Sequence, residues 1–179
     1  MRSAVDQSHQ FLAPALHRQA VCVDATLGNG NDTAFFLAQG VRKVIAFEVQ
    51  EDVLSQTQQN ISDSRLEANL DGHEHMDRYI HEEADAIVFN FGYCPGKESL
   101  IHTMETTSLE AVKIALRLLK VKGRMALVFY PHPEGIKEAE SIIQYLKTLD
   151  PYRYAICCVS QLNHSHSPYW VGIEKKKES

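Results

Sequence analysis

Short apolar runs recur along the chain and are separated by longer segments in which apolar and polar residues alternate with helical spacing. A continuous apolar run of four to eight residues is typical of a strand buried on both faces of a sheet. Runs of this kind predict strands at residues 20–25, 43–49, 84–91 and 123–130. A weaker strand is expected near residues 68–71.

The intervening segments carry the apolar spacing of amphipathic helices. They predict helices at residues 32–39, 51–64, 108–119 and 134–149. Gly40 is expected to end the first of these helices, and Pro151 stops the last. Thr107 and Glu110 fit a capping box at the start of the third helix. A further short helix is expected at residues 76–81.

Strands and helices alternate along most of the chain, which predicts a mostly parallel sheet with helices on both faces. Two further strands, at residues 154–160 and 169–174, follow each other directly, so we expect an antiparallel hairpin at one edge. The expected fold is α/β and Rossmann-like, with a seven-stranded sheet. Residues 1–179 are expected to form a single domain, with residues 1–17 as an N-terminal helical extension.

Composition and charge narrow the class of protein. The chain has 179 residues, 44% of them hydrophobic and 23% charged, as in an ordinary globular domain. A net charge of −5 argues against a protein that coats nucleic acid non-specifically, although a local basic patch could still grip one RNA loop. No apolar run reaches the roughly 18 residues of a membrane span, and the N-terminus lacks the apolar core of a signal peptide. A cytoplasmic protein with no membrane partner is therefore expected.

The four cysteines form no Cys-x-x-Cys pair and suit neither a zinc site nor a secreted disulfide framework. We expect buried, reduced thiols. The cysteines are Cys22, Cys94, Cys157 and Cys158.

A glycine-rich segment, Val23–Thr33, follows the first predicted strand and opens the first helix. Gly28 and Gly30 permit a tight turn and the close approach of a ligand to the backbone. The N-terminus of the helix then offers free N–H groups to an anion, such as the carboxylate of a methionine group.

The surroundings of this loop indicate the ligand. Asp24 precedes Gly28 by four residues, and Glu48 ends the next strand, where a carboxylate can accept both ribose hydroxyls of a nucleoside. A dinucleotide such as NAD is the alternative, but Thr33 occupies the place of its third glycine. The Asp-x-x-x-Gly-x-Gly form favours S-adenosylmethionine as the cofactor; a glycine turn without a ligand is a further alternative. The candidate cofactor-binding residues are Asp24, Thr26, Gly28, Asn29, Gly30, Asn31, Asp32, Glu48, Gln50, Gly72, His73 and Asn90.

A second motif, Asn90–Gly96, comes where the strand at residues 84–91 ends. It resembles the Asn-Pro-Pro-Tyr loop of enzymes that methylate amino groups. In that loop the Asn carbonyl and a backbone carbonyl accept hydrogen bonds from the target amine, and the aromatic ring packs on the target base. Asn90 and Tyr93 keep the outer positions, whereas Phe91 and Gly92 replace the prolines. The alternative is a simple Pro-Gly turn.

The segment Asp71–His75 alternates histidine with carboxylate, as a metal site would. No third ligand is placed by the sequence, and methyl transfer needs no metal, so we predict no metal. Because the segment follows a predicted strand, Gly72 and His73 are instead expected to border an adenine ring.

His132, His164 and His166 lie in predicted loops. His132 follows the strand at residues 123–130 and could contact RNA or remove a proton, or could be an ordinary loop residue. His164 and His166 are expected at the surface. The candidate catalytic residues are Asn90, Tyr93 and His132.

Across nearly its whole length the chain resembles the small bacterial YtqB-like rRNA methylase family, which includes the MnmM-type tRNA methyltransferases. The run Asn-x-Gly-Tyr-x-Pro-Gly is the most specific part of the match. The sequence departs from the family at Asn31, where His is common, and at Pro131, where Gly is common. The matching positions are 24–26, 28–30, 32–33, 72–73, 89–93, 95–96, 106–107, 132, 135, 163–168 and 173–175.

The resemblance implies a class I S-adenosylmethionine-dependent methyltransferase that converts the 5-aminomethyl group of a tRNA wobble uridine to 5-methylaminomethyl. Its partner would be the anticodon loop of tRNA, not DNA, contacted by this domain alone or by a homodimer. Methylation of rRNA or of a small molecule is the nearest alternative. A non-catalytic nucleotide-binding or assembly protein is an alternative of another class. The sequence does not decide between thiolated and unthiolated uridine.

Overall fold

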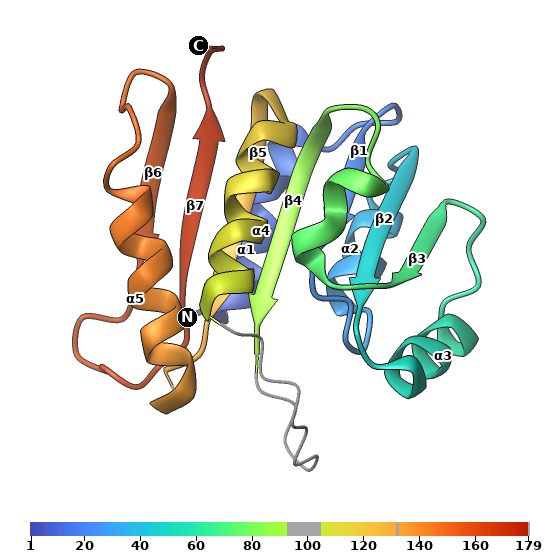
Figure 1. The fold of residues 1–179 in the computed structure, drawn as a ribbon, viewed down its shortest axis with the longest axis horizontal. Helices are drawn as coiled ribbons and strands as arrows, with labels where there is room; N and C mark the ends of the chain where they lie inside the picture. The colour runs from blue at the N-terminus through green and yellow to red at the C-terminus, as the bar shows by residue number, and fades with distance from the viewer. Residues whose placement is uncertain (93–104, 132, 179) are drawn as a thin grey trace.

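A single seven-stranded sheet forms the centre of the molecule, with strand order β3-β2-β1-β4-β5-β7-β6 (Figure 1). The computed structural model describes residues 1–92, 105–131 and 133–178. The sheet confirms the predicted strand number and the C-terminal hairpin. The strands are β1 (Val21–Asp24), β2 (Lys43–Glu48), β3 (Leu66–Leu70), β4 (Ala84–Phe91), β5 (Leu119–Phe129), β6 (Tyr154–Val159) and β7 (Tyr169–Lys175).

Helices cover both faces of the sheet, as predicted (Figure 1). Apolar residues of α1, α2 and α3 pack on one face, and those of η2, α4 and α5 pack on the other. The helices are α1 (Ala4–Leu12), η1 (Ala13–Ala15), α2 (Asn31–Ala38), α3 (Glu51–Asn60), η2 (His73–Arg78), α4 (Glu105–Leu118) and α5 (Pro133–Leu146). Among the described residues, none of these helices combines the length and the apolar character that crossing a membrane requires.

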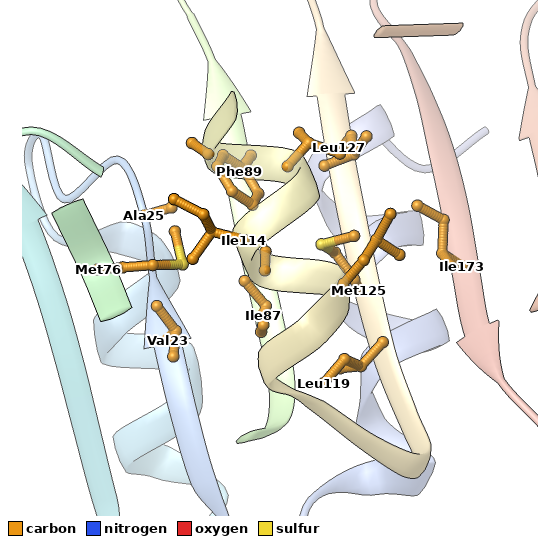
Figure 2. Close-up of a cluster of buried hydrophobic side chains, with 14 of the residues drawn as sticks. Val23, Ala25, Met76, Ile87, Phe89, Ile114, Leu119, Met125, Leu127 and Ile173 are labelled. Carbon is orange, nitrogen blue, oxygen red and sulfur yellow. The ribbon is translucent and has the colours of Figure 1, made fainter. Parts of the chain in front are cut away.

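The two-residue period of the strands divides the core into layers. In β1, Val23 points to the layer under α4, while its neighbour Cys22 points to the layer under α1 and α2. Figure 2 shows the larger layer, where Ile87 and Met125 extend from neighbouring strands toward Ile114 of α4. Because the central strands are buried on both faces, their sequences read as continuous apolar runs.

The chain order creates a topological switch point between β1 and β4, and we refer to the region beyond the carboxyl ends of these strands as the crevice. From β1 the chain moves outward through β2 and β3, and then crosses back to β4, which pairs with β1 on its other side. Both β2 and β4 run parallel to β1. Ligands of open α/β sheets bind beyond the carboxyl ends of the strands at such a switch point. The glycine-rich loop after β1 and Asn90 near the end of β4 both lie there.

Some element boundaries differ from the predictions. Helix α4 begins at Glu105, so Thr107 lies inside the helix and the predicted capping box at Thr107 and Glu110 is wrong. Strand β5 begins at Leu119, four residues early, because pairing with β4 continues through a register shift between Ala84 and Ala86. This irregular stretch contains Lys122, with φ of 68°.

Other boundaries and surface assignments shift as well. Helix α3 ends at Asn60 rather than 64, β3 starts at Leu66 rather than 68, and the short helix predicted at 76–81 is the 3₁₀ helix η2. The prediction of buried thiols holds for Cys22 but is wrong for Cys157 and Cys158, which are exposed on β6. Strand β6 pairs only with β7 and stands at the edge of the sheet, so its side chains stay largely in solvent.

The N-terminal segment, predicted as a helical extension, contains helix α1, which is anchored on the sheet. Ser3 and Asp6 form a capping box that starts α1. Trp170 Nε1 donates to Gln7 Oε1 at 3.3 Å, and Arg124 donates to the carbonyl of Phe11 at 2.8 Å. These contacts fix α1 against β5 and β7.

Candidate active site

The loop between β1 and α2 takes the backbone conformation that its glycines allow. Gly28 has φ of 46° and Gly30 has φ of 78°, both in the left-handed region. A Cβ on Gly30 would lie 2.5 Å from Ile61 Cδ1 and 2.9 Å from Thr57 Cγ2. The Thr57 hydroxyl also donates to the Gly28 carbonyl at 2.6 Å. The loop is therefore closely packed against α3 and has a defined shape.

Helix α2 starts at Asn31, and no side chain caps its N-terminus, because its N-cap residue is Gly30. Uncapped N–H groups at a helix start favour an anionic group. Asn29 and Asn31 are exposed on either side of Gly30, so the loop surface here is polar and open.

Asp24, at the end of β1, is fully buried. Its carboxylate accepts hydrogen bonds from the Thr33 hydroxyl at 2.7 Å and from the backbone N–H of Thr26 at 3.2 Å. Burial, and secondly the nearby charge of Asp32, raise the pKa of Asp24 to about 7, despite these hydrogen bonds. Asp24 thus ties the loop to α2 from below, instead of projecting into the crevice.

Glu48, at the end of β2, organises the other side of the crevice. Its Oε2 accepts from the Gly28 N–H at 3.1 Å, and its Oε1 accepts from the N–H groups of Val49 and Gln50, both at 2.9 Å. A carboxylate oxygen has two lone pairs, so Oε2 keeps one acceptor position for a further donor. Gln50 is the N-cap residue of α3 and contributes its backbone to this turn.

Asn90 lies directly beside the glycine-rich loop. Its backbone N–H donates to the Thr26 hydroxyl at 2.7 Å, and its side-chain Nδ2 donates to Asp32 Oδ2 at 3.3 Å. Its Oδ1 is buried and has no hydrogen-bond partner among the residues that the structure describes. A buried carbonyl oxygen without a partner costs free energy, so its presence here indicates a position prepared for a ligand donor.

Tyr130, which follows β5, borders the same amide. Its hydroxyl group has a hydrogen bond with the Asn90 side chain, which lowers its pKa, but burial outweighs this and leaves the pKa of Tyr130 raised. A Cβ added at Gly92 would lie 3.5 Å from the Tyr130 ring and 3.6 Å from Asn90 Oδ1. Gly92 therefore leaves the approach to this oxygen without a side chain.

His73 begins η2 and lies under the crevice. Its Nδ1–H donates to the Ala25 carbonyl at 3.1 Å, which leaves Nε2 as an acceptor. Nε2 is buried and finds no partner in the described part of the chain. Burial lowers the pKa of His73, so the ring is neutral. It contacts Phe89 and Phe91 edge-on.

The nearby segment Asp71–His75 makes hydrogen bonds to other side chains of the protein. Asp71 accepts from His75 at 2.7 Å and from the Tyr79 hydroxyl at 2.8 Å. Within residues 1–92, 105–131 and 133–178, no group of three His, Cys, Asp or Glu side chains could hold a metal ion. Gly72 precedes η2, where a Cβ would lie 2.2 Å from the Glu74 carboxylate.

Two of the predicted catalytic residues, Tyr93 and His132, lie outside the described residues. His164 and His166 are exposed in the loop between β6 and β7, as predicted. Sequence reasoning missed His9 and Tyr130, which contact the site from α1 and from the end of β5. A sequence signal for His9 was present, because Ser3 and Asp6 have the spacing of a capping box. This spacing predicts a helix that begins after Ser3 and contains His9.

The residues present fit S-adenosylmethionine on structural grounds. The crevice offers an uncapped helix start for a carboxylate and a free acceptor position on Glu48 for a hydroxyl. It also holds buried acceptors on His73 and Asn90 that lack partners. The acidic side chains Asp32 and Glu48 favour a positively charged sulfur.

The family model described as "Putative rRNA methylase" matches residues 44–174. The chain belongs to this family. A curated relative of Arabidopsis thaliana, "tRNA (mnm(5)s(2)U34)-methyltransferase, chloroplastic", is 31% identical over 195 residues, covering 98% of this chain and 70% of the relative.

Solved structures of rRNA methylase relatives agree with the fold. A protein of Clostridium thermocellum, described as a "putative rRNA-methylase", is 30% identical with a TM-score of 0.91, and 98% of each chain is covered. A methyltransferase of Streptococcus mutans, solved in complex with SAH, is 35% identical with a TM-score of 0.89, covering 98% of this chain and 99% of its own. The sheet order and hairpin are those of the class I methyltransferase fold.

Proposed function

We propose that this protein is an S-adenosylmethionine-dependent tRNA methyltransferase that methylates the 5-aminomethyl group of the wobble uridine, giving 5-methylaminomethyl-(2-thio)uridine. The observation that carries the proposal is the buried Oδ1 of Asn90, an acceptor without a partner beside the glycine-rich loop. An amine N–H is the donor that such an oxygen suits. The name of the Arabidopsis relative supports a wobble uridine of tRNA as the carrier of that amine.

The donor would lie along the glycine-rich loop. Glu48 would accept a ribose hydroxyl, the start of α2 would hold the methionine carboxylate, and Gly72 and His73 would border the adenine. When bound, S-adenosylmethionine supplies a methyl group on a positively charged sulfur, which keeps the electron pair of the broken bond as the amine takes the methyl.

The role of Asn90 is to orient the acceptor amine. A hydrogen bond from the amine to Oδ1 turns the nitrogen lone pair away from Asn90 and toward the glycine-rich loop, where the donor would lie. Positioning of this kind supplies a large share of the catalytic rate. Tyr93, which we propose packs on the base, and His132, which we propose contacts the RNA or accepts a proton, complete the site.

The first experiment is a methyl-transfer assay with labelled S-adenosylmethionine. Bulk tRNA from cells that lack the final wobble methylation serves as substrate, with rRNA and no RNA as parallel reactions. Mass spectrometry of the digested nucleosides identifies the product. Methylaminomethyluridine in tRNA supports the proposal, and label in rRNA alone overturns it in favour of the family's older description.

Substitution of Asn90 tests its assigned role. We expect Asn90→Ala to lower turnover about 100-fold, because the amine loses its orienting acceptor, while calorimetric donor affinity changes less than about twofold. Asn60→Ala, on the exposed end of α3, serves as a control with unchanged turnover. Equal losses of donor affinity and turnover in Asn90→Ala would contradict the assigned role.

We also propose that the protein forms a homodimer through the edge strand β6. Ile156 and Val159 on this strand are 37% and 36% exposed, and Leu162 in the following loop is fully exposed. An unpaired edge strand with apolar side chains is a template for pairing with another chain. Light scattering after size exclusion should give twice the chain mass, and Ile156→Lys should give a monomer. A monomeric wild-type protein contradicts the proposal.

A cytoplasmic location stays a prediction, since the Arabidopsis relative is a chloroplastic protein by name. Fractionation of the native host, with immunodetection of the protein, would place it.

A further inference from the structure

We infer that His9 and Asp32 act as a positioning pair for the Asn90 amide, so that helix α1 takes part in the methyl-transfer site. The inference rests on the proposed function, because it assumes that Asn90 Oδ1 receives the acceptor amine. Neither residue is assigned a direct contact with that amine.

His9 is held in one orientation. Its Nε2 lies 2.5 Å from Asp32 Oδ1, and its ring stacks on Phe35 with centroids 3.9 Å apart and an interplanar angle of 4°. The His9 side chain is only 16% exposed. The contact joins residues 23 positions apart in the sequence, so it exists only because α1 packs beside α2.

Asp32 links His9 to Asn90. Its side chain is 5% exposed, its Oδ1 accepts from His9, and its Oδ2 accepts from Asn90 Nδ2 at 3.3 Å. A carboxylate only accepts hydrogen bonds, so it selects the NH₂ end of the amide. The carbonyl end must then face away from Asp32, and this is the buried oxygen without a partner.

This arrangement decides which amide atom the substrate meets. If Asn90 turned its amide over, an NH₂ group would face the incoming amine and repel its N–H. The Asn90 backbone is already fixed by its hydrogen bond to Thr26. The amide plane is the remaining freedom. Tyr130 also contacts the amide, but its hydroxyl can donate or accept, so Asp32, held by His9, selects which end of the amide faces it. Loss of His9 leaves Asp32 free to rotate, and the amide with it.

Several contacts besides those of His9 hold α1 in place. Leu12 is fully buried, Gln7 bonds Trp170, and the Phe11 carbonyl bonds Arg124. A change at His9 should therefore disturb the site while the helix stays in place. This separates a positioning role from a structural one.

The test compares His9→Leu, which keeps bulk over Phe35, with His9→Gln, whose amide can still donate to Asp32. With saturating donor, we expect His9→Leu to lower kcat about tenfold, with donor Kd within about twofold of wild type, and His9→Gln to recover most of the loss. Gln7→Ala is the matched control, since it removes a contact of the same helix that involves neither Asp32 nor Asn90; it should leave kcat unchanged.

Two further measurements keep the inference falsifiable. In an Asp32→Ala background, His9→Leu should lower kcat no further, because His9 acts through Asp32. In protein without donor or RNA, the side-chain amide NMR signal of Asn90, assigned by its loss in Asn90→Ala, should shift or broaden in His9→Leu and not in Gln7→Ala.

Wild-type kcat and an unmoved Asn90 signal in His9→Leu would overturn the inference, as would a loss that His9→Gln fails to restore. If wild-type protein transfers no methyl to tRNA, the proposed function fails. The NMR measurement then still decides whether His9 positions Asn90.

Discussion

At the scale of single residues, a comparison of Gly30 with Gly40 measures how far the stability and donor affinity of the protein depend on the close packing of the glycine-rich loop. Both have left-handed backbones, with φ of 78° and 74°, but only Gly30 is closely surrounded. We expect Gly40→Ala to reduce the free energy of unfolding by about 1–2 kcal/mol, the cost of the backbone conformation. Gly30→Ala should cost more and also weaken donor binding, because its Cβ would strike Ile61 and Thr57.

Urea unfolding and calorimetric titration with S-adenosylmethionine measure both effects. Donor affinity should be unchanged in Gly40→Ala, since nothing lies within 4 Å of its added Cβ and it lies at the far end of α2. Equal changes in the free energy of unfolding and in donor affinity for the two variants would refute the close packing described for the loop.

Asp24 makes the stability of the folded protein depend on pH. Its pKa rises from 3.8 to about 7 on folding, so between these values the folded state holds a proton that the unfolded state has released. Its contribution to stability is therefore present below pH 4 and is lost as pH rises toward 7. We expect Asp24→Asn to gain stability relative to wild type as pH rises from 5 to 7, by at most about 1.4 kcal/mol per pH unit.

Urea unfolding at several pH values measures this difference. Asp63→Asn is the control of opposite sign, because hydrogen bonds from Arg65 lower the pKa of Asp63 to about 2. The loss of stability in Asp63→Asn should stay constant from pH 5 to 8 and shrink only as pH falls below 4. A constant difference for Asp24→Asn over that range would show that Asp24 is ionised in the folded protein.

Much of the candidate site could be predicted from sequence at this scale. Gly28 comes after β1, Glu48 ends β2 and Asn90 lies near the end of β4. The carboxyl ends of neighbouring parallel strands meet at one edge. Their grouping follows from topology alone. His9 and Tyr130 could not be placed this way, because their contacts depend on how α1 and the end of β5 lie against that edge.

At the scale of elements, α1 carries the least expected part of the structure. Leu12, at its C-terminal end, is fully buried between α1 and the sheet. We expect Leu12→Ala to reduce the free energy of unfolding by about 2–5 kcal/mol through loss of burial and the cavity it leaves. Leu162→Ala, at a fully exposed position, should change it by less than about 0.5 kcal/mol.

The one tryptophan of the chain gives a second measure of helix docking, since Trp170 bonds to Gln7 of α1. Its emission should move to longer wavelength in Leu12→Ala if α1 loosens. Unchanged stability and emission would mean that α1 is not held by its apolar contacts.

The sequence predicted which segments form strands and helices better than it predicted the first and last residues of each. The apolar runs placed β1, β2 and β4 to within a residue or so, because buried central strands leave an unambiguous pattern. The start of β5 was missed, since residues 119–122 look like a helix end and pair with β4 only through an irregular register. The exposed thiols of β6 were missed because edge position is a property of the sheet order.

At the scale of the whole molecule, ligand binding should raise stability only for the correct cofactor. S-adenosylhomocysteine at 100 times its Kd should add about 2.7 kcal/mol, which corresponds to a rise in Tm of about 5–11 °C for a domain of this size. NAD at the same concentration should leave Tm unchanged. A rise with NAD alone would show that the loop binds a dinucleotide.

The sequence by itself determined the alternation of strands and helices, the switch point between β1 and β4, and the residues that follow those strands. These features depend on local periodicity, on glycine conformation and on general rules of parallel sheets. Only the tertiary structure decided that Asp24 is buried beneath the loop, that His9 reaches Asp32, and that Asn90 Oδ1 has no partner. Burial and hydrogen-bond partners depend on which distant segments pack together, and no local pattern encodes that.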